Sequence, residues 1–135
     1  MGPFRGKGRV TAAIELLTRC YPIRRCTRDA GDPFLYGQTG RCLAPCVAQP
    51  DGIASHDALV GDLLRWVAGG MPERFNPSSP PEAAALALTA KLARQCRFEE
   101  AAEVKKALED TMALRRSCRA VTEALSINAA VLWPD

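Results

Sequence analysis

The sequence predicts a mostly α-helical protein that carries a cysteine-rich loop near its N-terminal end. Apolar residues recur every three to four positions in several stretches, which is the pattern of amphipathic helices. Residues 21–50 instead combine Gly, Pro and Asp in turn-forming patterns. Four of the six cysteines of this 135-residue chain lie between Cys20 and Cys46. A loop of this kind buries little apolar surface, so metal coordination is a candidate for what holds its shape.

The first helix is expected over residues 7–20, because Val10, Ala13, Ile14 and Leu17 follow helical spacing. Pro22 ends it.

A second helix is expected over residues 55–68. Ser55 is its predicted N-cap, and Leu59, Leu63, Trp66 and Val67 form its apolar stripe. Gly69 and Gly70 end this helix. His56, the single histidine, is interpreted as a surface residue.

Two further helices follow a proline-rich linker. The first begins at a capping box, Ser79 to Glu82, and runs from Pro80 to about Gln95 with Leu86, Ala90 and Ala93 as its apolar positions. The second runs from Phe98 to about Ala124, and the pair forms an αα-hairpin. A lone hairpin cannot bury its seam, so it needs another hairpin, a second copy of itself, or the second helix of the same chain. The predicted segments are 1–20, 21–50, 51–69, the linker 70–81, the hairpin 82–124 and the tail 125–135, in which Ala129 to Trp133 could begin a strand.

The net charge of +3 is distributed unevenly. Residues 1–46 carry eight Lys or Arg against three Asp or Glu, whereas the rest carry ten against twelve. A basic N-terminal third suits a phosphate backbone, and a solvated surface is the alternative. The candidates for phosphate contacts flank the loop: Arg24, Arg25, Arg28 and Arg41.

No apolar run approaches the roughly 18–20 residues that span a bilayer, and the N-terminus does not resemble a signal peptide. We therefore expect no membrane partner and a cytoplasmic protein, in which clustered cysteines are more often ligands than disulfides. Nothing in the sequence suggests independent catalysis. Glu99 and Glu100 are adjacent, so on a helix they diverge, and their position at a helix start explains them.

Three strings in this order carry a family resemblance: Tyr21-Pro-Ile-Arg-Arg-Cys26, Gly40-Arg-Cys42-Leu-Ala-Pro-Cys46 and Arg97-Phe-Glu-Glu-Ala-Ala102, preceded by Gly2-Pro-Phe4. The chain resembles the middle of the UvrC family, the incision subunit of bacterial nucleotide excision repair. It also resembles the UvrC-like part of actinobacterial fusions with a DnaQ-type exonuclease. Phe-Glu-Glu-Ala-Ala is similar to the core of the UVR motif.

The resemblance implies that residues 1–20 are the end of a GIY-YIG nuclease domain whose catalytic residues are absent here. It implies a non-catalytic module or fragment that binds DNA and a UvrB-type partner. Two alternatives stay open: a part of an incision endonuclease that is active only in a longer product, and a protein–protein adaptor with a UVR hairpin and a metal knot. The implied partner-binding residues, with self-association also open, are Phe98, Glu99, Ala101, Ala102, Val104 and Leu108.

The resemblance also implies an iron–sulfur cluster in the cysteine loop. Cys26, Cys42 and Cys46 match three of the four family cysteines, but Phe34 occupies the fourth position. Cys20 is the candidate replacement. Zinc, or no metal, remains the alternative. Cys96 and Cys118 are interpreted as small buried hydrophobic residues.

Overall fold

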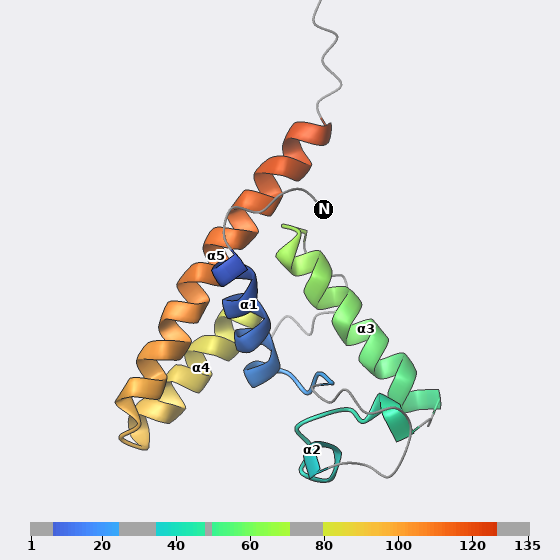
Figure 1. Cartoon of the computed structure of the whole chain (residues 1–135), viewed down its shortest axis with the longest axis vertical. Helices are drawn as coiled ribbons and strands as arrows, with labels where there is room; N and C mark the ends of the chain where they lie inside the picture. Colours follow the sequence, from blue (N-terminus) through green and yellow to red (C-terminus); the bar gives the residue numbers. More distant parts are fainter. Residues whose placement is uncertain (1–6, 25–34, 48–49, 71–79, 127–135) are drawn as a thin grey trace, which may run out of the picture.

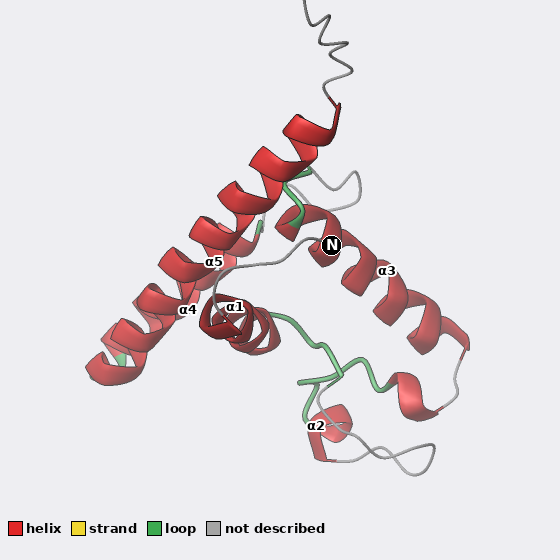
Figure 2. Ribbon diagram, turned by 45° about the horizontal axis from the view of Figure 1, so that its top comes forward, coloured by secondary structure: helices red, strands yellow, loops and turns green. Residues whose placement is uncertain are grey.

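The computed structural model describes residues 7–24, 35–47, 50–70 and 80–126. In these ranges the chain forms helices and contains no strand (Figures 1 and 2). The elements are α1 (Lys7–Cys20), α2 (Leu35–Gln38), the 3-10 turn η1 (Pro45–Val47), α3 (Pro50–Val67), α4 (Pro81–Arg94) and α5 (Phe98–Ser126). The predicted mostly-α fold class is confirmed. No helix in the described ranges is both long and apolar enough to cross a membrane. The predicted strand start at Ala129 lies outside these ranges.

Helix α1 lies between the α4–α5 hairpin on one side and α3 on the other (Figure 1). The view in Figure 2 shows the same order, with α2 and η1 beyond the C-terminal end of α1. Helix α5 packs along both α1 and α4, whereas α3 meets α5 over a smaller contact. The last turns of α5 extend past all of its neighbours (Figure 1).

Three buried residues of α1 each belong to a different core cluster. Leu16, which is 1% exposed, packs with Ala85 and Leu92 of α4 and with Ala101 and Val104 of α5. Ala13 packs with Leu114 and Cys118 of α5. Leu17 packs with Leu63 and Trp66 of α3. One short helix therefore contacts every long helix of the described chain, and the core is largely aliphatic.

The same packing shows what covers the hairpin seam. The structure shows that the hairpin seam packs against helices of the same chain. Helix α1 covers more of this seam than α3, which corresponds to the second helix named among the alternatives. Ala101 and Val104 are 7% and 0% exposed beneath Leu16, and Leu108 packs at the edge of the same cluster.

Several predicted helix positions need correction. Helix α3 begins at Pro50, so Ser55 lies within the helix and is not its N-cap. Proline is favoured in a first helical turn because its missing N–H would have no partner there, and Asp51 supports the same turn. The loop predicted over 21–50 also contains α2 and η1, each about one turn long.

The start and the buried face of α4 also differ from the prediction. Its N-cap is Pro80, which makes no side-chain capping bond. The backbone of Pro80 is extended at ψ 155°, because a residue before a proline is disfavoured in the helical region. Leu86 is 58% exposed, whereas Pro81, Ala85 and Leu92 are buried. Alanine and leucine occur on all faces of this helix, so periodicity alone did not identify the face that packs in the core. On α1, Ile14 is likewise 59% exposed.

The C-terminal end of α3 is closed by a Schellman motif, as the glycine pair predicted. The Gly69 N–H bonds the Trp66 carbonyl at 3.0 Å, and the Gly70 N–H bonds the Arg65 carbonyl at 3.0 Å. Arg115 of α5 donates to the Trp66 carbonyl at 2.9 Å and to the Gly70 carbonyl at 3.3 Å. Its guanidinium also lies 5.2 Å from the centre of the Trp66 ring. A cation here complements the negative end of the α3 dipole.

Helix α4 ends in a similar motif with a cysteine at the left-handed position. Cys96 has φ +59°, its N–H bonds the Ala93 carbonyl at 3.0 Å, and the Arg97 N–H bonds the Leu92 carbonyl at 3.0 Å. Cys96 is exposed, so its interpretation as a buried hydrophobic residue is wrong, whereas Cys118 is buried as expected. The turn geometry, rather than core packing, fixes the position of Cys96.

Replacing Cys96 by glycine is expected to stabilise the protein by about 1 kcal/mol, because glycine has no Cβ to oppose a positive φ. Chemical denaturation of the full chain measures this change. Cys96→Ala is the matched control and is expected to give no comparable gain. Equal effects of the two substitutions would show that the thiol, rather than the backbone, limits this turn.

Candidate nucleic-acid and partner interface

Two hydrogen bonds connect the described parts of the cysteine loop to each other and to α3. The Leu43 N–H bonds the Pro22 carbonyl at 2.9 Å, so the stretch after α1 lies beside the stretch before η1. The Arg24 N–H bonds Nε2 of His56 at 3.3 Å. The His56 side chain is only 14% exposed, and its Nδ1 lies 3.3 Å from Oδ1 of Asp57. The surface interpretation of His56 is therefore wrong, because this ring attaches the loop to α3.

The described cysteines occupy two different environments. Cys42 is buried, and its Sγ accepts a hydrogen bond from the Ala44 N–H at 3.3 Å; Cys46 follows in η1. Cys20 packs at the edge of the α1–α4–α5 core cluster, and burial raises the pKa of its thiol. Within the described ranges, no three Cys, His, Asp or Glu side chains gather closely enough to hold a metal ion. Cys26 and Phe34 lie outside those ranges.

The candidate ligands lie in different parts of the described structure. Cys42 and Cys46 belong to the loop at and just before η1, whereas Cys20 is the last residue of α1. A metal ligand must be a thiolate, and burial at Cys20 disfavours that charged form and raises the pKa of its thiol.

Two of the four arginines predicted to contact DNA lie in the described loop. Arg24 is partly buried and Arg41 is exposed. Each lies two residues along the chain from the Leu43–Pro22 hydrogen bond, which brings the two stretches together. Arg25 and Arg28 lie outside the described ranges.

The predicted partner-binding residues divide into two groups. Phe98 is 65% exposed, and Glu99 and Ala102 are also exposed on the outer side of the hairpin. Ala101, Val104 and Leu108 face α1 and α4 instead. Only the first group is open to another molecule in this conformation.

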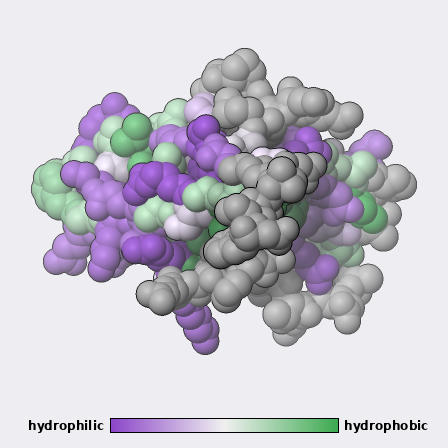
Figure 3. Space-filling model, turned by 90° about the horizontal axis from the view of Figure 1, so that it is seen from above, coloured by the Kyte–Doolittle hydropathy of each residue, from purple (hydrophilic) through white to green (hydrophobic). Residues whose placement is uncertain are grey.

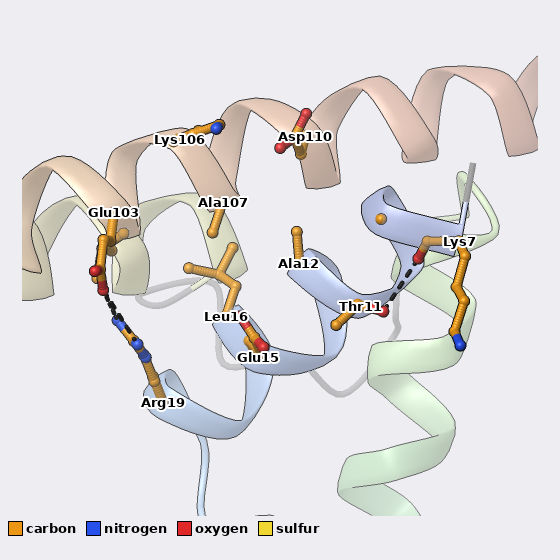
Figure 4. Close-up of a pocket in the computed structure, with 12 residues that line it drawn as sticks. Lys7, Thr11, Ala12, Glu15, Leu16, Arg19, Glu103, Lys106, Ala107 and Asp110 are labelled. Atoms are coloured by element: carbon orange, nitrogen blue, oxygen red, sulfur yellow. Dashed lines mark hydrogen bonds and ion pairs between the residues drawn. The ribbon is translucent and has the colours of Figure 1, made fainter. Parts of the chain in front are cut away.

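Charged residues line an open groove of about 690 Å³ between α1 and α5. Figure 4 shows Leu16 at its apolar side and Arg19 reaching Glu103 at one end, an ion pair of 3.4 Å. Near the hairpin turn, Arg97 makes a bidentate pair with Glu100, with both N···O distances 2.6 Å. This hydrogen-bonded pair lowers the pKa of the Glu100 carboxyl. The carboxylate thus interacts with a neighbouring arginine at the helix start.

Sequence reasoning missed three residues that organise this region: His56, Arg97 and Arg115. A signal existed for Arg97, because it precedes Glu100 by three residues at a helix start. No local pattern indicates the bonds of His56 or Arg115, since both connect to backbone groups far away in the sequence.

The helices and loop together define a small helical module with a cysteine-containing turn beside an αα-hairpin. Curated proteins of one family are similar to this chain. UvrABC system protein C from Mycobacterium bovis (strain BCG / Pasteur 1173P2) is 29% identical over 123 residues, which cover 86% of this chain and 17% of the relative. The Mycobacterium tuberculosis (strain ATCC 25618 / H37Rv) protein of the same name gives the same values. That of Thermobifida fusca is 32% identical over 75 residues, 50% of this chain and 11% of its own length.

These matches show that the chain is related to the UvrC family. The match covers only 17% of the length of the mycobacterial relatives. No family model matches the sequence, and no solved structure matches it.

Proposed function

We propose that this chain acts in nucleotide excision repair as a UvrC-like, non-catalytic module that binds DNA and a UvrB-type helical hairpin. The observation that supports this most is the similarity to UvrC proteins over 86% of the chain. The exposed side of the α4–α5 hairpin carries the UVR-like residues Phe98, Glu99 and Ala102. Arg24 and Arg41 supply positive charge in the neighbouring loop.

The exposed aromatic ring of Phe98 is the strongest candidate for a partner anchor. Large aromatic residues often dominate the binding energy of an interface once they are buried in it. In Figure 3, hydrophobic surface reaches the left end of the molecule, where the α4–α5 turn lies in Figure 1. The inner seam of the hairpin is already filled by Leu16, so this proposal assigns the partner to the outer side.

Replacing Phe98 by alanine is expected to weaken binding of a UvrB-type hairpin peptide by about thirtyfold, the effect of losing about 2 kcal/mol. Calorimetric titration of the full chain measures this change. Val121→Ala is the matched control, because Val121 is 49% exposed on the same helix but lies in its last turns. Binding that Phe98→Ala leaves intact would contradict the assigned surface, and no binding by the wild type would contradict the proposed partner.

We propose further that Cys26, Cys42 and Cys46 hold an iron–sulfur cluster or a zinc ion, with a fourth ligand other than Cys20. The hydrogen bond from the Ala44 N–H to Cys42, and the position of Cys20 at the edge of the α1–α4–α5 core cluster, support this division. The bound metal would cross-link a loop that has little apolar surface of its own.

Protein purified without oxygen is expected to contain iron or zinc, measured by elemental analysis and an absorbance spectrum. Cys42→Ala and Cys46→Ala should lose most of the metal, because each change leaves only two of the three cysteine ligands. Cys20→Ala should retain the metal, as should the control Cys118→Ala. Metal-free wild-type protein would exclude the site, and loss in Cys20→Ala would make Cys20 a ligand.

A further inference from the structure

A second cavity, of about 530 Å³, lies where the cysteine loop meets the hairpin. We call it the loop–hairpin cavity. Its wall combines the end of α1 and the turn at Gly40 and Arg41 with Leu88 and Leu92 of α4 and the first turn of α5. Segments distant in the sequence thus enclose one space of the size that small ligands occupy.

Basic residues contribute to the lining of the loop–hairpin cavity. Arg19, Arg41 and Arg97 line it, against the single carboxylate of Glu100. Arg97 is already oriented by its bidentate pair with Glu100, which uses two of its five N–H donors. Arg41 is exposed, and its guanidinium has no ion pair with a residue of the described ranges. Two guanidinium groups can therefore meet an anion here.

Apolar and uncharged residues also line the cavity. Leu88 and Leu92 supply aliphatic surface, and Tyr21 supplies an aromatic ring. Burial raises the pKa of the Tyr21 hydroxyl and of the Cys20 thiol, so both groups stay neutral at physiological pH. A ligand that contacts both kinds of residue combines an anionic group with an apolar surface, and an aromatic ring is one such surface.

We propose that the loop–hairpin cavity accepts one unpaired nucleotide of a DNA strand, with its phosphate on Arg41 and Arg97 and its base against Tyr21 and Leu88. This inference rests on the proposed DNA-binding function, because it assigns a nucleotide subsite beside the basic loop. Arg41 belongs both to the basic loop and to the lining of the cavity. Stacking and apolar contact accept any base, and so the site selects unpaired nucleotides rather than a sequence.

The test compares a fully paired DNA duplex with the same duplex carrying unpaired thymines, by fluorescence anisotropy with the full chain. The wild type is expected to bind the duplex with unpaired thymines about tenfold more tightly, because the stacking of one base supplies enough binding free energy for this difference. Arg97→Ala should remove this preference and leave duplex affinity unchanged. Arg94→Ala is the matched control, an exposed arginine on the preceding helix that does not line the cavity.

Thr18→Phe gives an independent test, because it fills the cavity and retains every arginine. Loss of the preference in both Arg97→Ala and Thr18→Phe, with unchanged thermal melting, is the expected result. No preference in the wild type, or a preference that survives both changes, would overturn the proposal. Equal competition by thymidine 5′-monophosphate and by O-phosphotyrosine would also overturn it, since a phosphorylated protein would then fit as well. Failure to bind the paired duplex at all would instead refute the proposed DNA-binding function.

Discussion

Gly69→Ala is expected to destabilise the protein by about 2–4 kcal/mol, combining left-handed strain with overpacking. Gly69 closes α3 at φ +93°. A Cβ at this position would lie 2.7 Å from Cβ and 3.0 Å from Cα of Arg119 on α5. The second of these atoms belongs to the backbone of a long helix, so it cannot move aside as a flexible side chain would. Denaturation followed by circular dichroism measures the loss.

Gly61→Ala provides the control within the same helix. A Cβ at Gly61 meets nothing within 4 Å, so alanine there should stabilise α3 by about 0.5–1 kcal/mol through its better helix propensity. Opposite signs at the two glycines would establish that α3 docks on α5 through the Gly69 turn. If both substitutions stabilise the protein, the end of α3 does not pack against Arg119 in solution.

The same turn shows how far the sequence could predict this fold. The glycine pair predicted the end of α3, because a left-handed residue closes a helix most easily when it is glycine. The start of α3 was placed too late because Ser55 was interpreted as its N-cap. In the structure, a Cβ at Gly52 would lie 3.3 Å from the Leu43 carbonyl oxygen, so the glycine serves a close approach to the cysteine loop. Such a requirement depends on a distant segment and leaves no local pattern.

The candidate interface was predictable to a similar degree. The cysteine spacing and the Phe-Glu-Glu-Ala-Ala string located its residues, but not their exposure. Phe98 and Val104 both belong to the hairpin pattern, yet one is 65% exposed and the other 0%. This difference in exposure depends on where α1 packs. Periodicity could not decide which face of α1 is buried, because Ile14 and Leu16 each belong to a possible apolar stripe of that helix.

The position of α1 is therefore the structural feature on which the assignment of the partner surface depends. Leu16→Ala is expected to cost about 2–5 kcal/mol, since it removes a buried side chain and leaves a cavity beneath it. Leu16 is 1% exposed and contacts the cluster that includes Ala101 and Val104. Ile14→Ala, two residues away on the same helix and 59% exposed, should change stability by less than about 0.5 kcal/mol.

These two variants also separate two ways in which the hairpin could meet its partner. If α1 covers the seam in solution, Leu16→Ala destabilises the chain, and an added UvrB-type hairpin should bind wild type and Ile14→Ala equally well. If the partner instead displaces α1, the weakened packing in Leu16→Ala should make binding tighter, because less free energy is needed to expose Ala101 and Val104. Stability that is insensitive to Leu16→Ala would show that the seam is open. The partner would then pair with the inner residues rather than with Phe98 on the outer side.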